Sequence, residues 1–547
     1  MASSSETVQR TNQIVGRRRW WALATVMLTM FFSSMDQTVV STAIPTIVSK
    51  LNGLNLYSWL FSAYMMASAV TVPIYGKLSD VFGRKPFYIF GLVMFGVGSA
   101  ISGLSHTMLE LVIARGIQGI GAGAMMSMPR ATIGDIFDPK ERGRWMGVIG
   151  AVFGLSSIIG PALGGWITDS LSWRWVFYIN LPFAVLALIG VIVTLPRVRA
   201  EHRVQVDWFG ALLMIIGLIP ILLGFTWAGT KYAWGSSQII LLFVVGVVLL
   251  VLFLLWERRA KEPVLTPTLF KSRIFTMSLI LGIFMMMGMF GSMMYLPTYV
   301  QGVIGLNATN SGFLLSPMMI SFIVASVISG QIMTRTGRYV RLANVSSAII
   351  IVGFILLATL NVNTHFWSVI IYMVVLGLGI GALMPLLNVA VQNAFPYEMM
   401  GTVNSTQQFV SSLGGVIASP IFGSVLNNGF QHKLNETMPA QLNAMKSTLS
   451  SLDPQALLTA QAQHALKSKF ASMGSAGQTL YNQLIHAVKV SLTTGVHHLF
   501  LVGLIFGCLT FIGTFFLPEV RLKGKEYFAS SDRASGDAPI GQKPQVE

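Results

Sequence analysis

Charge and cysteine are both scarce in this chain. Only 10% of its 547 residues are charged and 53% are hydrophobic. The charged share is less than half of the roughly 25% that is usual in soluble domains, which excludes a single soluble globular unit. The one cysteine, Cys508, excludes an intrachain disulfide and a cysteine metal cluster.

Several sites for chemistry are also missing from the sequence. No phosphate-binding loop or ATP-binding domain is recognisable, so an ion gradient is the expected energy source. His497 and His498 are adjacent rather than one helical turn apart, which does not suit a helical zinc pair. A nucleophile, base and metal that together could form an intramembrane enzyme are not found, so we predict no enzyme activity, metal or cofactor.

What the chain has instead is a series of apolar runs. Each run is close to the ~20 residues that cross a ~30 Å hydrocarbon layer as a helix. The first is too long for a signal peptide, so we expect it to be retained. Fourteen transmembrane helices are predicted, near residues 20–46, 57–76, 87–104, 108–128, 145–168, 174–194, 208–228, 237–256, 275–300, 311–333, 343–362, 366–388, 402–427 and 494–517.

The basic residues indicate an orientation. Lys and Arg number 36 against 20 Asp and Glu, a balance that would suggest nucleic acid in a soluble protein. Here 27 of them lie on one side of the predicted helices and 3 in the short loops of the other side. Because basic loops stay in the cytoplasm, we predict a multi-pass cell-membrane protein with both termini cytoplasmic and no nucleic acid partner.

One connection is much longer than the others. Residues 428–493 are polar and are predicted to lie outside the cell. Asp453 and Pro454 suit the N-cap and first position of a helix, and a second apolar run from about Gln478 leads into the last span. A helical hairpin is predicted, with a mobile loop as the alternative.

A glycine-rich charged segment, Gly76 to Lys85, lies between the second and third predicted helices. Two glycines permit a tight reversal, and Asp80 can accept hydrogen bonds from a neighbouring helix's amino end or from an arginine. The segment resembles the signature loop of the major facilitator superfamily. In that family the acidic residue latches the two halves on the cytoplasmic side, which implies this role for Gly76, Asp80, Gly83 and Arg84.

Other elements match the same family in order and spacing. Residues Arg115, Gln118, Gly119, Gly121 and Ala122 resemble its fourth-helix element, and residues 35–45 and 173–182 add further matches. In the fifth helix, an element characteristic of antiporters is matched by Gly154, Gly160, Pro161, Gly164 and Gly165. Together the matches resemble the fourteen-helix drug:proton antiporter branch.

The resemblance implies an all-α integral membrane protein with the major facilitator fold. Two six-helix bundles would rock about a central site, with two extra helices between them, in a chain that works as a monomer. The expected divisions are a cytoplasmic N-terminus, a first bundle, the extra pair, a second bundle and a cytoplasmic tail, at residues 1–19, 20–203, 204–259, 260–520 and 521–547. A second-half copy of the signature loop, around Arg335 and Arg338, lacks its acid.

Independently of any family, Asp36 is the one carboxylate placed deep inside a predicted span. A buried acid is costly unless it is protonated or paired, so its default interpretation is functional. Burial raises a carboxyl pKa and a nearby cation lowers it, so a site that opens alternately can take up and release a proton. We predict proton coupling at Asp36, Arg115 and Gln118. The alternative is a carboxylate permanently hydrogen-bonded between helices.

Methionine and aromatic side chains are candidates for a substrate cavity. Methionine adapts to varied ligands, although a run on every side of a helix must also face lipid. We predict that the cavity is lined by Met286, Met289, Met293, Trp59, Phe61 and Tyr64. For Trp59 the alternative is an aromatic belt at the membrane interface.

These observations predict a proton-coupled multidrug antiporter of a bacterial plasma membrane. It would export amphipathic, often cationic compounds by alternating access and so confer antibiotic resistance. The alternatives are export of a lipid-like or anionic metabolite by the same fold and, from another class, an intramembrane enzyme.

Overall fold

A computed structural model describes residues 16–51, 56, 59–137, 139–196, 207–228, 232–260, 263, 265–305, 315–396, 399–438, 468, 470 and 474–520. Most of these residues are helical. The long helices are α2 (Arg17–Leu51), α3 (Trp59–Phe82), α4 (Arg84–Leu104), α5 (Met108–Ile136), α6 (Pro139–Ser170), α8 (Asn180–Thr194), α9 (Trp208–Trp227), α10 (Ser237–Glu257), α11 (Arg273–Tyr299), α13 (Leu315–Thr336), α14 (Val340–Ala358), α15 (Phe366–Ala394), α16 (Met400–Thr437) and α20 (Gly474–Phe515). Three short helical segments are α7 (Trp175–Tyr178), the 3-10 helix η2 (Pro267–Lys271) and the π-helix η3 (Val300–Ile304).

The helices follow the apolar runs of the sequence. Thirteen segments of the described chain are long and apolar enough to cross a membrane. With the more polar α3, they match the fourteen predicted runs in order, so the all-helical membrane fold is confirmed. The ends differ most around the long connection, because α16 continues to Thr437 and α20 already begins at Gly474. The predicted hairpin start at Asp453 and Pro454 lies outside the described residues.

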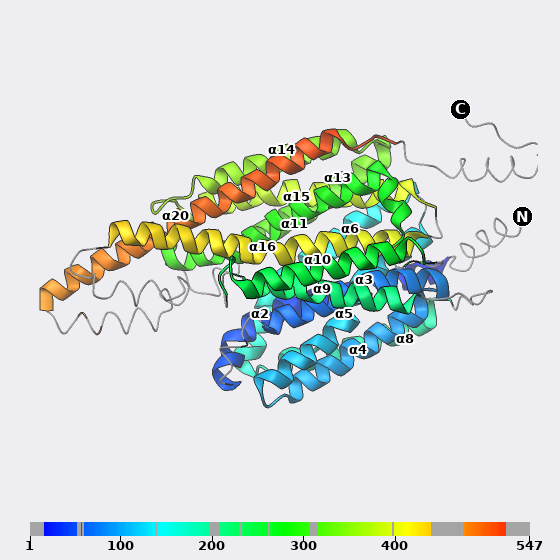
Figure 1. Cartoon of the computed structure of the whole chain (residues 1–547), viewed down its shortest axis with the longest axis horizontal. Helices are drawn as coiled ribbons and strands as arrows, with labels where there is room; N and C mark the ends of the chain where they lie inside the picture. Colours follow the sequence, from blue (N-terminus) through cyan, green and yellow to red (C-terminus); the bar gives the residue numbers. More distant parts are fainter. Residues whose placement is uncertain are drawn as a thin grey trace, which may run out of the picture.

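The helices assemble as two halves and an additional pair (Figure 1). Helices α2 to α8 pack together as an N-terminal half, and α11 to α20 pack together as a C-terminal half. Helices α9 and α10 pack against each other, and α9 also contacts α3 and α16. The two halves meet mainly where α6 packs on α13 and where α3 packs on α16.

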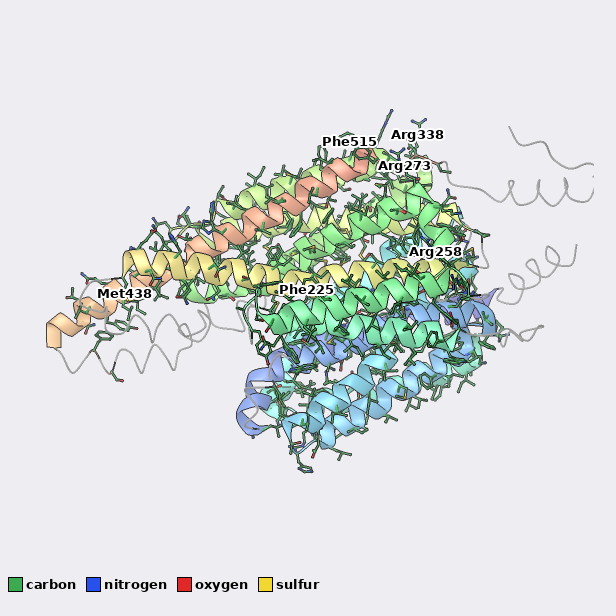
Figure 2. All side chains as sticks on the ribbon, in the orientation of Figure 1. Phe225, Arg258, Arg273, Arg338, Met438 and Phe515 are labelled. Atoms are coloured by element: carbon green, nitrogen blue, oxygen red, sulfur yellow. The ribbon has the colours of Figure 1, made fainter. Side chains whose placement is uncertain are left out.

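One end of the helical bundle is rich in arginine. Helix α2 begins and α20 ends at this end, on the right in Figure 1. Arg258, Arg273 and Arg338 also lie here, whereas Met438 lies at the opposite end (Figure 2). We call this the basic end.

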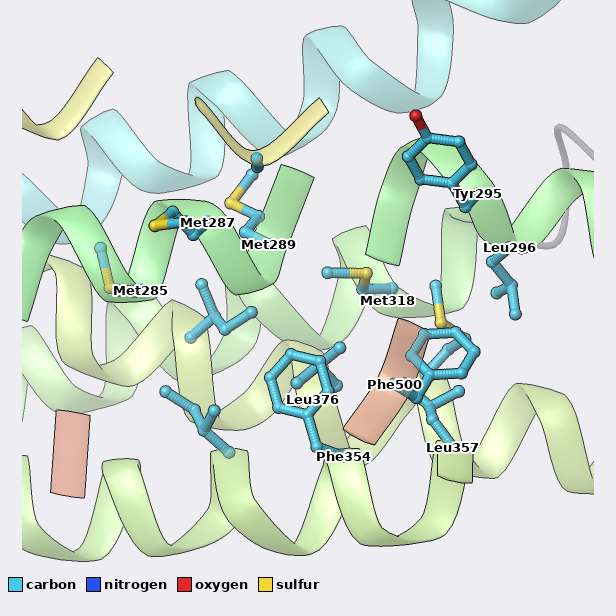
Figure 3. Packing of buried hydrophobic residues seen from close by; sticks show 14 of the residues in the cluster. Met285, Met287, Met289, Tyr295, Leu296, Met318, Phe354, Leu357, Leu376 and Phe500 are labelled. Carbon is cyan, nitrogen blue, oxygen red and sulfur yellow. The ribbon is translucent and has the colours of Figure 1, made fainter. Parts of the chain in front are cut away.

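Apolar side chains both fill the bundle and cover its outside. In the C-terminal half, α11 contributes Met285, Met287 and Met289 to a buried cluster that includes Phe354 of α14 and Leu376 of α15 (Figure 3). Helix α10 instead exposes valine and leucine over most of its surface. A helix that is apolar on all sides without being buried in protein suits contact with hydrocarbon chains.

Close backbone approach holds the two halves together at the crossing of α6 and α13. A side chain at Gly147 would place its Cβ 2.7 Å from the backbone oxygen of Ser326. The Ser326 hydroxyl donates a hydrogen bond to the Gly147 carbonyl at 3.2 Å. Gly143 and Gly330 pack backbone to backbone in the same crossing. The helices can therefore lie this close only while these positions have no side chain.

We predict that Gly147→Val separates the halves at this crossing, since overpacking costs about 1–3 kcal/mol and the obstacle is backbone. Spin labels at cysteines replacing the exposed Arg144 and Arg335, in a Cys508→Ser background, should report longer distances. Gly165→Ala on the same helix is the control, because nothing lies within 4 Å of its Cβ position. Equal label distances in both variants would contradict this account of the crossing.

Candidate transport site

The carboxylate of Asp36 is fully buried in the N-terminal half and accepts three hydrogen bonds. Arg115 donates through Nη1 to Oδ2 at 2.6 Å. Gln118 Nε2 and Asn180 Nδ2 donate to Oδ1 at 2.9 and 2.7 Å. A charge without contact to water is stable only when it is paired and hydrogen-bonded in this way. The structure thus brings together Asp36, Arg115 and Gln118, which the sequence singled out separately, and adds Asn180 from α8.

Arg115 is held on several sides. Its Nη1 also donates to Gln118 Oε1 at 2.7 Å, and its Nε donates to the Leu60 carbonyl at 3.4 Å. The guanidinium carbon lies 4.2 Å from the centre of the Tyr64 ring, a cation–π arrangement. Tyr64 was predicted to line a cavity, and this is corrected: its buried ring lies against Arg115.

The local sequence explains why these side chains meet. Arg115 and Gln118 are three residues apart, so they share one face of α5. Gly119, directly after Gln118, packs on the Tyr64 carbonyl of α3 with no room for a side chain. The absence of a side chain brings the two helices close enough for Tyr64 to reach the guanidinium.

Ser99 of α4 completes the network and was not found from the sequence. Its Oγ accepts hydrogen bonds from Gln118 Nε2 at 2.7 Å and from Asn180 Nδ2 at 3.3 Å. A single serine in an apolar run carries no signal of its own. Asn180 belonged to the family resemblance, but nothing in its sequence context indicated Asp36 as its partner.

A cavity lies between the two halves, and its lining includes residues of both. Residues of α2, α3, α5, α6, α11, α15 and α16 line it. Its apolar wall is mostly methionine: Met30, Met65, Met126, Met285, Met286, Met289 and Met384. Its polar lining residues are Gln37, Ser68, Asn388, Gln407, Gln408, Ser411 and Ser412. Among the described lining residues, Arg130 alone is charged.

The predicted lining residues divide into two groups. Met286 and Met289 line the cavity. Trp59, Phe61 and Met293 are not among the residues that line this cavity, and a contact between them and cargo stays a prediction. The Trp59 ring meets Trp227 of α9 edge to face at 6.2 Å, and Met293 packs on the core of the C-terminal half. A helix turns by about 100° per residue, so only one face of the α11 methionine run can reach the cavity.

Asp80 connects the halves at the basic end. Its Oδ1 accepts from the backbone nitrogen of Gly401 at 2.7 Å, and its Oδ2 accepts from that of Thr402 at 2.6 Å. The Thr402 hydroxyl donates to Oδ2 at 2.8 Å. These amides are at the start of α16, where a carboxylate is favoured by both the free N–H groups and the helix dipole. One side chain of the N-terminal half thereby caps a helix of the other half.

Arg84 joins the same cluster. Its Nη1 lies 2.5 Å from Asp80 Oδ1, and its Nε donates to Asp135 Oδ2 at 2.8 Å. Residues Gly76 to Lys85 were predicted to form a turn, and this is corrected: α3 continues to Phe82 and α4 begins at Arg84. Gly83 makes the reversal alone, with a φ of 84° that glycine adopts without strain. Gly76 packs against Ser405 and Gly401 of α16 with no room for a side chain.

The glycine element of α6 contacts both halves. Gly160 packs against Thr38 of α2, two residues from Asp36, where a side chain would collide. A Cβ on Gly154 would lie 2.5 Å from Ile323 of α13 in the other half. Pro161 lies inside this helix, Gly164 accepts a hydrogen bond from Thr168 at 2.7 Å, and Gly165 has open space. Helix α6 therefore touches both the surroundings of Asp36 and the opposite half.

Residues 26–419 match the family model described as Major Facilitator Superfamily. The chain belongs to the major facilitator superfamily. Members of this superfamily are membrane transporters, so the protein is a multi-pass transporter rather than an enzyme, and the predicted family is confirmed.

Relatives of known name are similar over nearly the whole chain. The multidrug transporter protein MdtP of Bacillus subtilis is 38% identical over 514 residues, which cover 93% of this chain and 95% of the relative. Multidrug resistance protein 3 of the same species is 36% identical over 506 residues, which cover 91% of this chain and 95% of the relative. This major facilitator therefore matches these relatives in overall length as well as in sequence.

Two solved structures share the major facilitator fold. The human organic anion transporter MFSD10 superposes with a TM-score of 0.57 at 16% identity, covering 81% of this chain and 99% of that one. The proton:xylose symporter XylE superposes with a TM-score of 0.57 at 13% identity, covering 94% of this chain and 98% of that one. At these identities the likeness concerns the fold alone.

We predict that Asp80→Asn loosens the contact between Asp80 and α16. The neutral amide cannot match a carboxylate that accepts from two backbone amides, and charged hydrogen bonds contribute about 1.5–3 kcal/mol. Deuterium exchange in peptides that contain Gly401 and Thr402 should accelerate about tenfold or more. Glu141→Gln, at an exposed acid of the basic end paired with Arg19, is the control. If the start of α16 exchanges deuterium equally slowly in Asp80→Asn, the Asp80 carboxylate does not hold the two halves together.

Proposed function

We propose that this transporter is a proton-coupled multidrug exporter that moves amphipathic compounds outward by alternating access. Relatives whose names describe multidrug transport, at 38% and 36% identity over nearly the whole chain, support the cargo class. The fungal relative "Efflux pump dotC", 33% identical over 440 residues, supports the outward direction. Proton coupling is inferred from the buried acid Asp36.

The observation that carries the proposal is the adjacency of two residues on α2. Asp36 faces the buried network of the N-terminal half, and the next residue, Gln37, lines the central cavity. A change in the charge of Asp36 therefore acts on the helix that also forms a wall of the cavity. The next residue, Thr38, contacts α6, because its hydroxyl donates a hydrogen bond to the Ser156 carbonyl at 3.3 Å. Proton binding and cavity shape are in this way linked through one helix.

The network can accommodate Asp36 with or without a proton. As a carboxylate, Asp36 accepts from Arg115, Gln118 and Asn180. A carboxylic acid needs an acceptor for its O–H, and Asn180 Oδ1 has no hydrogen-bond partner in the described structure. Rotation of the Asn180 amide turns that acceptor toward Asp36. Protonation would then weaken the attraction to Arg115 and release the helices that this charge holds together.

Alternating access requires contacts between the halves that can open. At the basic end, Asp80 caps α16 and the glycines of α6 lie against α13. With the basic end in the cytoplasm, as the distribution of arginines supports, these contacts close the cavity on the cytoplasmic side. We also propose that the chain works as a monomer in the lipid bilayer.

The cavity suits cargo of variable shape, because methionine side chains are flexible and polarizable. The family resemblance favours compounds that are often cationic. A second candidate cargo, an anionic or lipid-like compound, is favoured by one observation: the charged side chain in the described lining is Arg130, and no acidic residue is present there.

Transport into inverted membrane vesicles tests the proposal. The probes are ethidium, which is cationic, phenylnaphthylamine, which is neutral, and anilinonaphthalene sulfonate, which is anionic. At least one should accumulate in vesicles that are energised with an acidic interior, and nigericin plus valinomycin with potassium, which together dissipate the pH gradient and the membrane potential, should abolish the accumulation. Accumulation that survives the loss of both would eliminate proton coupling.

We predict that Asp36→Asn abolishes accumulation against a gradient while leaving the amount of inserted protein similar, because asparagine keeps the shape but cannot cycle a proton. Asp36→Glu should retain part of the activity. Glu110→Gln is the control, since Glu110 is exposed and its carboxylate only caps the start of α5. If Asp36→Asn concentrates the probe as well as the parent does, Asp36 is not the coupling residue.

A further inference from the structure

Arg130 is a buried cation without a partner. It lies on α5, is 5% exposed and lines the central cavity. Within the described residues its guanidinium makes no ion pair and donates no hydrogen bond, and its Nε is buried with no acceptor. An unpaired charge in such a place is costly, so a group that carries negative charge or accepts hydrogen bonds is expected to pair with the guanidinium.

The other arginines enclosed by the bundle are paired. Arg115 binds Asp36, and Arg84 binds Asp80 and Asp135. Arg142 donates to the carbonyls of Phe137 and Gly134 at 2.9 and 2.8 Å. What sets Arg130 apart from these is its place in the cavity wall, where an occupant rather than another side chain can reach it.

The rest of the lining offers Arg130 no counter-charge. The residues that line the cavity include no aspartate or glutamate among those described. Gln407 of α16, in the other half, also lines the cavity, and its buried Oε1 has no hydrogen-bond partner. The cavity thus holds an unpaired cation contributed by one half and an unpaired acceptor contributed by the other, among apolar methionine side chains.

We propose that the cargo bound in this cavity is an amphipathic anion whose carboxylate, sulfonate or phosphate group pairs with Arg130. Its apolar body lies against the methionines, and a donor group on it can reach Gln407. Guanidinium is well suited to this role because its planar donors bind such oxyanions in a bidentate way. The inference rests on the proposed export function and narrows its substrate class.

Binding to the purified full-length chain in nanodiscs of phosphatidylcholine tests this independently of transport. Anilinonaphthalene sulfonate and phenylnaphthylamine are a matched pair that differ by the sulfonate group. After subtraction of protein-free nanodiscs, the parent should bind the sulfonate roughly tenfold or more tightly than the neutral compound, as one charge-assisted contact implies. Arg130→Gln should remove this preference and leave the affinity for the neutral compound within about twofold. Arg130→Lys should keep part of the preference.

Two further variants keep the outcome interpretable. Arg259→Gln removes an exposed charge that is not part of the cavity lining and should behave as the parent. Met126→Glu places a carboxylate one helical turn before Arg130, where it can pair with the guanidinium, and should also remove the preference without touching Arg130. Removing an unpaired buried charge is not expected to unfold the protein.

The source of the anion is resolved by a second lipid. If an anionic lipid headgroup occupies the site, nanodiscs containing phosphatidylglycerol should weaken sulfonate binding in the parent more than in Arg130→Gln. Equal weakening in both assigns the site to free compounds. The inference is overturned if the parent shows no preference for the sulfonate, or if the preference survives in both Arg130→Gln and Met126→Glu. Absence of transport with the preference intact would overturn the export function instead.

Discussion

A charge enclosed by apolar helices must find a partner, and this constraint organises the structure. The few charged side chains inside the bundle are concentrated where helices have to be held together. Asp36 and Arg115 join α2 and α5, with α4 and α8 added through Ser99 and Asn180. Each such cluster is strong only while its charges remain, which makes it suitable as a switch.

The Asp36 network and the Asp80 cluster differ in which parts of the structure they connect. The Asp36 network lies wholly within the N-terminal half, so the proposed protonation would act without separating the halves. The Asp80 cluster crosses between halves, since the carboxylate binds the start of α16. In the proposed proton-coupled mechanism, the Asp36 network would sense the driving ion and the Asp80 cluster would open and close access. Helix α6, which packs on α2 near Asp36 and on α13, lies between them.

The methionines of helix α11 lie in three different environments, because packing sets how the helix is turned about its axis. Its methionines at one face line the cavity, while Met287 packs in the core (Figure 3) and Met294 is 54% exposed on the outside. The same residue type therefore lines the cavity, fills the core and covers the outside of the bundle. Methionine meets all three demands because it is apolar and easily changes shape. The unpaired Arg130 gives this otherwise adaptable cavity its one fixed electrostatic feature.

The sequence by itself determined the helices and their order, and it singled out Asp36 as the acid placed deep inside a span. Apolar runs of membrane-spanning length leave a chain no alternative but helix, because backbone groups in hydrocarbon must be satisfied within the segment. It also indicated that Asp80 would meet a helix amino end or an arginine. The arginine, Arg84, is only four residues from Asp80. Which helix Asp80 meets depended on contacts between residues 321 and 322 positions apart, which local patterns do not encode. Only the tertiary structure placed Tyr64 under Arg115 rather than in the cavity and left Arg130 unpaired in its wall, because the rotation of each helix about its axis is set by packing against its neighbours.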